Sequence, residues 1–247
     1  MEWNNGDGTG GICTGTLIGR DSVLTNAHCL LDRKTKQPRK ATMRFRPNLR
    51  DGRSPDTATV NVAVSIYGQG YTKGNPADDW AILKIDRPLG DNYGYLGWRR
   101  LNLTDDKVLG KTINQVRLAG YSGDFPDPNN GGQTAGVHAG CNILGTPTQG
   151  RLKGLLFHQC DSMGGASGSP MFALFNDGIY YIVGLHSGWY ELDTRSIPPA
   201  QRQACKVFDD QEKLVDVEAC VNRGVQVSRW SAQAEALRKG GATKAGN

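Results

Sequence analysis

The stretch that decides the fold runs Gly164-Gly165-Ala166-Ser167-Gly168-Ser169-Pro170 and continues into the apolar run Met171-Phe172-Ala173-Leu174-Phe175. Glycines on both sides of Ser167 allow the backbone to turn tightly around one hydroxyl and to direct its amides at a neighbouring oxygen. The apolar run that follows is typical of a buried strand. The sequence therefore predicts a serine held in a tight loop at the start of a strand.

Two upstream stretches supply partners for this serine. His28 lies in Leu24-Thr25-Asn26-Ala27-His28-Cys29, and Asp79 lies in Asp78-Asp79-Trp80-Ala81-Ile82-Leu83. An imidazole is the side chain best suited to remove the proton of a hydroxyl near neutral pH, and a carboxylate behind it holds the reactive tautomer. We predict Ser167 as nucleophile, His28 as base and Asp79 as orienting acid. Asp79 is preferred to Asp78 because it directly precedes the expected strand.

The same loop also offers hydrogen-bond donors. The backbone N–H groups of Gly165 and Ser167 are predicted to form an oxyanion hole, because both can point into one concavity. A second serine, in Gly120-Tyr121-Ser122-Gly123, has the same G-x-S-G form. It is followed by the turn-rich residues 124–130 rather than by a strand, so Ser122 is not the predicted nucleophile.

Chain length and the frequent turn-forming residues predict an all-β protein. The chain has 247 residues, enough for one large domain or two small ones, and 33 of these residues are glycines. Short apolar runs alternate with turn formers, which favours strands over helices. An alanine-rich terminal helix is expected at 228–239. The expected strands are residues 12–18, 22–26, 41–46, 58–67, 80–85, 112–119, 136–143, 154–158, 170–175 and 180–186.

Charge and hydropathy argue against a nucleic-acid or membrane partner. The net charge is +5, from 29 basic and 24 acidic residues, and the basic residues are scattered. The densest basic patch, residues 33–40, contains a proline and no apolar period, so we interpret it as a solvated loop. No run is long and apolar enough to span a bilayer.

Six cysteines indicate disulfides in an exported protein. No pair has the C-x-x-C spacing of a zinc or redox site. Sequential neighbours are the favoured pairs, Cys13 with Cys29 and Cys141 with Cys160, although fifteen pairings are possible. We therefore expect a secreted or periplasmic protein. The start of the chain has no signal segment, so the leader of such a protein would be absent from this sequence. With four histidines and no H-E-x-x-H, no metal or cofactor is expected.

Together, the three stretches around His28, Asp79 and Ser167 resemble those of trypsin-like serine proteases of the chymotrypsin fold. The pair Ser169-Pro170 and the stretch Gly184-Leu185-His186-Ser187-Gly188 are most similar to sequences of the bacterial glutamyl endopeptidase branch. The resemblance implies two antiparallel six-stranded β-barrels and a C-terminal helix.

The resemblance also implies how the chain is divided. Residues 1–97 would form a barrel with His28 and Asp79, and residues 98–247 a barrel with Ser167. An insertion near 190–221 would be closed by a disulfide between Cys205 and Cys220. The implied activity is that of a secreted serine endopeptidase, monomeric, which cleaves protein or peptide substrates through an acyl-enzyme. Ala166 replaces the aspartate that pairs with the N-terminal amine in trypsin, so that route of activation is not expected.

Signals for substrate preference conflict. His186, with Ser187 beside it, matches the histidine that receives an acidic side chain in glutamyl endopeptidases. Asp161 lies where trypsin keeps the aspartate that attracts arginine or lysine. Both readings stay open, with a slight preference for acidic substrates.

Two further functions are considered. An esterase of the α/β-hydrolase type would use the order Ser122, Asp161, His186, but neither serine motif has the required G-x-S-x-G. A protease-fold binding module without catalysis is the other alternative, and the intact set of three residues opposes it.

Overall fold

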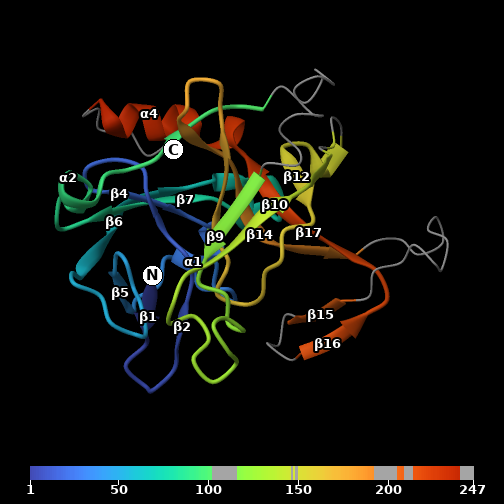
Figure 1. Cartoon of the computed structure of the whole chain (residues 1–247). Coiled ribbons are helices and arrows are strands. Elements are labelled where there is room, and N and C mark those ends of the chain that lie inside the picture. The colour runs from blue at the N-terminus through green and yellow to red at the C-terminus, as the bar shows by residue number, and fades with distance from the viewer. Residues whose placement is uncertain (102–115, 146, 148–149, 192–204, 209–213, 240–247) are drawn as a thin grey trace.

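Two curled β-sheets lie side by side in the computed structural model of the chain (Figure 1). The structure describes residues 1–101, 116–145, 147, 150–191, 205–208 and 214–239, without the side chains of 151, 205–208, 214 and 215. Neighbouring strands pair antiparallel in both sheets, which confirms the expected all-β class. The parallel pair of β8 (Gly97–Trp98) with β14 (Tyr180–Glu191) is an exception.

The first sheet carries the N-terminal half of the chain. Its strands pair in the order β2 (Gly10–Ile12), β1 (Glu2–Asn4), β5 (Thr42–Phe45), β6 (Ala58–Tyr67), β7 (Ala81–Ile85), β4 (Ser22–Thr25) and β3 (Thr16–Leu17). Two differences from the five expected strands account for these seven: the strand expected at 12–18 is interrupted at residues 13–15 and gives β2 and β3, and β1 was not expected. Residue 13 is held there by a disulfide to Cys29.

The second sheet carries the later part of the chain. Its strands pair in the order β10 (Gly136–Cys141), β9 (Val116–Gly120), β13 (Pro170–Leu174), β14, β17 (Cys220–Gln226), β12 (Leu155–His158) and β11 (Ile143–Gly145), with β8 added on β14. The strand expected at 136–143 is divided into β10 and β11, and with β8 on β14 this sheet has eight strands rather than the six that the resemblance implies. Residues 112–115 of another expected strand lie outside the described part.

Helices are few and short within the described residues. They are α1 (Ala27–Leu30), α2 (Leu89–Tyr93), α4 (Ser231–Arg238) and the 3-10 helices η1 (Gln69–Lys73), η2 (Pro76–Asp78), η4 (Gly150–Leu152) and η7 (Val227–Arg229). The expected terminal helix is therefore confirmed, with η7 as its first turn. Among the described residues, every helix is too short or too polar to cross a lipid bilayer.

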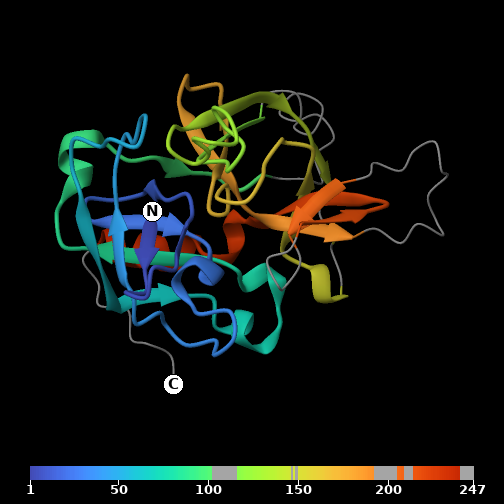
Figure 2. The same cartoon turned by 90° about the horizontal axis from the view of Figure 1, so that it is seen from below.

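The terminal helix crosses back to the first sheet, as two views at right angles show (Figures 1 and 2). Trp230 and Ala234 are fully buried with Ile18 and Leu24 of the first sheet and Val225 of the second. Burial of apolar surface is the main favourable contribution to folding, so this shared core holds the two sheets together.

The insertion near 190–221 contains a two-stranded hairpin, β15 (Cys205–Phe208) with β16 (Leu214–Val217). Cys13–Cys29 and Cys141–Cys160 form disulfides, which confirms the favoured neighbours. The side chain of Cys205 lies outside the described part, so its pairing with Cys220 stays a prediction. The division of the chain at residue 97 also stays a prediction.

Candidate active site

The ends of two neighbouring strands bring His28 and Asp79 together. β4 and β7 pair antiparallel, with Thr25 at the end of β4 opposite Ala81 at the start of β7. His28 follows β4 in α1, and Asp79 lies just before β7, so both project from the same edge of the sheet. The Asn26 amide fastens the two segments by donating to the Asp79 carbonyl at 2.7 Å.

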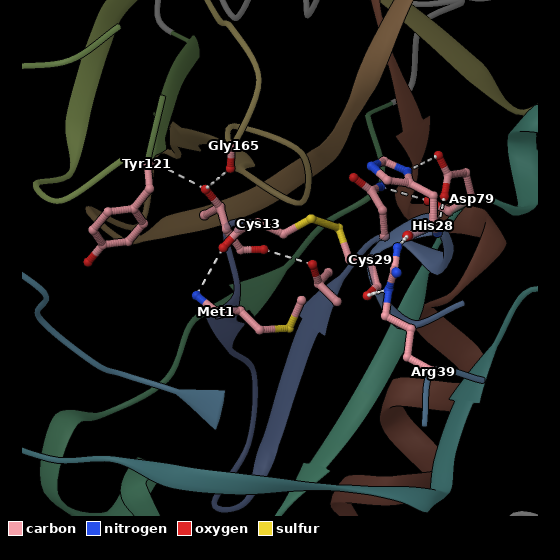
Figure 3. The surroundings of a disulfide bond; sticks show 11 residues. Met1, Cys13, His28, Cys29, Arg39, Asp79, Tyr121 and Gly165 are labelled. Atoms are coloured by element: carbon pink, nitrogen blue, oxygen red, sulfur yellow. Dashed lines mark hydrogen bonds and ion pairs between the residues drawn. A yellow bond between two sulfur atoms is a disulfide. The ribbon is translucent and has the colours of Figure 1, made fainter. Parts of the chain in front are cut away.

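Asp79 accepts two hydrogen bonds from His28 (Figure 3). The His28 backbone N–H donates to Oδ1 at 3.0 Å, and Nδ1 lies 2.8 Å from Oδ2. An ionised carboxylate only accepts hydrogen bonds, so we assign the ring proton to Nδ1. Nε2 then keeps a lone pair, which is the state a general base requires.

The Asp79 carboxylate is almost completely buried, with 2% of its side chain exposed. Burial alone would raise its pKa. The charge of His28, the hydrogen bonds from His28 and the charge of Arg223 outweigh this effect and lower the pKa of Asp79 below its ordinary value. Asp79 is therefore ionised at neutral pH.

Asp78 has a different partner. Its Oδ1 accepts from the Arg229 guanidinium, and its Oδ2 accepts from the Asn75 amide at 3.1 Å. Arg229 belongs to η7, so this ion pair connects the segment before β7 to the end of β17. The structure thus brings Asp79, and not Asp78, to His28.

Two glycines in the serine loop are required by their surroundings. Gly165 and Gly168 have φ of 96° and 85°, in the region that favours glycine. A Cβ on Gly165 would lie 2.5 Å from the Tyr121 carbonyl oxygen, and one on Gly168 would lie 2.2 Å from the Thr14 carbonyl oxygen. The glycines on both sides of Ser167 therefore let the loop pack against two other segments.

Alternate amides of the serine loop are left unbonded. The N–H groups of Ala166 and Gly168 donate to the carbonyls of Met163 and His186, each at 3.0 Å. Among the hydrogen bonds of the described residues, none uses the N–H of Gly165 or of Ser167 as donor. These are the two amides that the sequence predicts as oxyanion donors, and they remain free to bind a ligand oxygen.

Thr14 joins the serine loop to the first sheet. Its N–H donates to the Ser167 carbonyl at 2.7 Å, and its hydroxyl donates to the Gly165 carbonyl at 3.1 Å. Its own carbonyl accepts from the Thr25 hydroxyl at 2.7 Å. The adjacent disulfide then leads directly to Cys29, the neighbour of His28 (Figure 3). Sequence reasoning missed Thr14, whose only signal is its place after Cys13.

The Ser167 side chain is partly exposed, and its hydroxyl makes no hydrogen bond with any described residue. The loop and His28 are thus placed on a common frame through Thr14 and the disulfide, without a direct bond between the hydroxyl and the imidazole. Contacts between nucleophile and base are often loose in ligand-free proteins and tighten with substrate.

Ser122 has a structural role instead. Its hydroxyl is hydrogen-bonded to the Asp124 carboxylate at 2.5 Å and accepts from the Met163 N–H at 2.9 Å. The next residue, Gly123, donates to the Gly164 carbonyl at 2.7 Å. The look-alike motif therefore supports the segment leading into the serine loop.

His186 is buried and pairs with a second histidine that sequence reasoning missed. His186 Nδ1 lies 3.0 Å from Nε2 of His158, and the His158 Nδ1 accepts from the Cys160 N–H at 3.2 Å. Burial is the main reason why the pKa of His158 falls to about 4 and the pKa of His186 falls well below its ordinary value. Both imidazoles are therefore neutral at pH 7.

The tautomers of this pair follow from the chain of hydrogen bonds. His158 Nδ1 is an acceptor, so its proton lies on Nε2 and is donated to His186 Nδ1. His186 then carries its own proton on Nε2. It therefore offers one N–H donor and no charge.

The two other predicted binding residues lie in different surroundings. Asp161 is exposed, and its backbone N–H donates to His138 Nδ1 at 2.7 Å. Ser187 is buried, and its hydroxyl donates to the Arg223 carbonyl at 3.5 Å. An exposed Asp161 does not form the buried charged base that a pocket for arginine or lysine needs.

Cys13, His28 and Cys29 are the one cluster of potential metal-binding atoms within the described part of the chain. Their ligand atoms lie within 4.8 Å of one another. Both sulfurs are joined in a disulfide, however, and a metal requires thiolates. This cluster is therefore not a metal site.

Comparisons with known proteins agree with this geometry. The family model described as Trypsin matches residues 2–200. A glutamyl endopeptidase of Bacillus licheniformis is 28% identical over 165 residues, which cover 66% of this chain and 45% of that protein. Serine protease 23 of Bos taurus is 27% identical over 210 residues, covering 75% of this chain and 51% of that protein. The chain thus spans about half the length of these curated relatives.

Solved structures agree in fold. A Glu endopeptidase structure has a TM-score of 0.65 and 21% identity, covering 97% of this chain and 89% of that one. The thermostable serine protease AL20 has a TM-score of 0.64 and 15% identity, covering 98% and 96%. These likenesses confirm the chymotrypsin-type fold. With the family model matched over most of its length, the chain belongs to the trypsin family of serine proteases.

Proposed function

We propose that the chain is a serine endopeptidase whose catalytic residues are Ser167, His28 and Asp79. The observation that carries the proposal is the buried 2.8 Å contact between His28 Nδ1 and Asp79 Oδ2 beside a serine loop with two free amides. That contact fixes the tautomer in which Nε2 can accept a proton. Family membership supports peptides and proteins as the substrates.

The first half of the reaction transfers the acyl group to the enzyme. The Ser167 oxygen attacks the peptide carbonyl carbon, and the hydroxyl proton passes to His28 Nε2. The carbonyl oxygen becomes negatively charged and accepts from the N–H groups of Gly165 and Ser167. Collapse of this intermediate breaks the C–N bond, and His28 gives its proton to the departing amine.

The second half releases the acyl group to water. His28 removes a proton from the attacking water, and the same two amides stabilise the second oxyanion. Collapse returns the proton to the Ser167 oxygen. Asp79 stays ionised throughout and stabilises the imidazolium that forms in each half.

Acidic residues are the preferred site of cleavage in this proposal. The neutral His158–His186 pair has one N–H donor, at His186 Nε2, which would bind a substrate carboxylate, and Ser187 is the next residue along the chain. The exposed position of Asp161 does not support a preference for arginine or lysine. The name of the glutamyl endopeptidase relative supports the same preference.

The other functions considered have less support. In the esterase arrangement the Ser122 hydroxyl is already held by Asp124, and Nδ1 of His186 is held by His158. A binding module without catalysis would not need free amides beside a serine and a fixed tautomer at His28. The disulfides support a secreted or periplasmic location. A monomeric state remains part of the proposal.

The first prediction concerns the nucleophile. Ser167→Ala should abolish labelling by a fluorophosphonate probe, because the probe forms its bond with the activated hydroxyl. Ser122→Ala is the matched control and should keep labelling. Labelling followed by gel fluorescence gives the measurement, and a labelled Ser167→Ala protein would overturn the assignment.

The second prediction separates the adjacent aspartates. Asp79→Asn should reduce kcat by about four orders of magnitude, because an amide donor at this position favours the wrong imidazole tautomer. Asp78→Asn should reduce activity far less, since its main loss is the ion pair with Arg229. Steady-state kinetics on a fluorogenic peptide measure both, and an equal loss in the two variants would contradict the assignment.

The third prediction concerns specificity. Digestion of an unbiased peptide library should give cuts mainly after glutamate or aspartate, with His186→Ala reducing this preference. Mass spectrometry of the products identifies the residue before each cut. Cuts mainly after arginine or lysine would instead favour the Asp161 hypothesis.

The fourth prediction concerns acid stability. The pKa of His158 is about 4 in the folded protein and near the ordinary 6.5 when unfolded. Below pH 6.5 the unfolded chain therefore binds a proton that the folded protein does not. As the pH falls from 7 to 5, His158 should lower the free energy of unfolding by on the order of 2 kcal/mol. Above pH 7 it should have no effect.

Urea unfolding at pH 7 and pH 5 measures the effect. His158→Gln removes the titrating group, so its stability should fall less than that of the parent over this range. An equal fall in parent and variant would show that His158 is not held neutral by burial.

A further inference from the structure

Arg223 lies at the junction of the two sheets, on the opposite face of its strand from His186. It pairs in register with Gly188 of β14, whereas the next residue, Gly224, pairs with His186. Side chains alternate between faces along a strand, and directly opposite residues share a face. Arg223 therefore lies on the face of Val225, which contributes to the core shared with the first sheet.

Arg223 is partly buried, and one nitrogen of its guanidinium is unpaired among the described residues. Its Nε is buried and makes no hydrogen bond, and no carboxylate of the described residues lies within ion-pair distance of it. Asp79 is near enough for the charge of Arg223 to influence it, but both of its oxygens already accept from His28. A buried guanidinium N–H without an acceptor is costly, so a negatively charged ligand oxygen would be favoured there.

Space for such a ligand exists beside Arg223. A Cβ on Gly188, the residue opposite Arg223 in β14, would have no atom within 4 Å. Tyr71 borders the same region from η1, because β17 contacts η2, which directly precedes Asp79, and η2 contacts η1. The region thus lies next to the catalytic aspartate and is open at Gly188.

The basic loop at residues 33–40 lies next to Tyr71 and the catalytic histidine. Arg39 donates to the carbonyls of His28 and Cys29 at 3.3 Å and 3.2 Å, which fixes the loop beside the catalytic histidine. The Lys36 ammonium lies 5.4 Å from the centre of the Tyr71 ring. The loop expected only to be solvated therefore adds positive charge to the same side of the site.

We propose that Arg223 and the basic loop form a second substrate subsite, which binds an acidic side chain at a position other than the residue before the cut. The proposal rests on the proposed peptidase function and extends it. His186 recognises its residue with a neutral donor, and Arg223 recognises a second residue with a permanent charge. Substrates of this enzyme would then carry two acidic residues near the cleaved bond.

The test is a peptide series with glutamate moved through the flanking positions. The residue before the cut is fixed as the one the parent enzyme cleaves best, and glutamine at each position is the matched control. The parent should prefer glutamate to glutamine at one flanking position by about tenfold in kcat/KM. Arg223→Gln should bring that ratio close to one.

Two further variants separate charge from structure. Arg223→Lys keeps the charge and should retain part of the ratio, whereas Arg223→Met keeps only the aliphatic stem and should lose it. If Arg223→Gln does not fold, these two variants decide the question. Arg117→Gln removes an exposed cation from β9 of the same sheet and should keep the parental ratio.

Several results would overturn the subsite. They are an equal fall for glutamate and glutamine peptides, no preference in the parent at any flanking position, and a change confined to the residue before the cut. An equal fall for both peptides would indicate that Arg223 acts through Asp79 instead. Loss of probe labelling in the parent would be a separate result, since it would contradict the peptidase function itself.

Discussion

A buried carboxylate that must stay charged is the constraint on which the site depends. Asp79 is removed from water, and the hydrogen bonds and charge of His28, together with the charge of Arg223, make its ionised form stable there. The same bonds fix the orientation and tautomer of the imidazole. The antiparallel pairing of β4 with β7 brings both residues to the same end of these two strands. Stabilising the acid and preparing the base are thus one interaction.

The two sheets must also be held in one position, because the proposed nucleophile and the proposed base come from different sheets. Three contacts act on this junction: the apolar core around Trp230, the Asp78–Arg229 ion pair, and the bonds of Thr14 to the serine loop. Thr14 has the shortest path to His28, through the Cys13–Cys29 disulfide. An error of about 1 Å in this position can cost roughly a hundredfold in rate, so rigid fastening here matters for catalysis.

Much of this arrangement could be predicted from sequence because its signals are local. The strand at 58–67, the terminal helix, the glycines beside Ser167 and the choice of Asp79 each depend on residues within one short stretch. Thr14, His158 and Arg223 could not be predicted, since their roles arise from contacts between distant strands. His158 meets His186 only because β17 lies between β12 and β14. The interrupted strand at 13–15 was missed for the same reason.

In this proposal, the charges around the site divide recognition into two kinds. Burial keeps His158 and His186 neutral, so this pair can position a carboxylate but cannot balance its charge. Arg223 carries a guanidinium cation, and its buried Nε has no acceptor among the described residues. In this proposal, His186 offers a directional donor to the residue before the cut, and Arg223, on the opposite face of the β14–β17 pair, offers a positive field to a second acidic residue. Because electrostatic attraction acts over longer distances than a hydrogen bond, the cation would first draw acidic substrates toward the cleft, and the histidine would then select the residue to be cut.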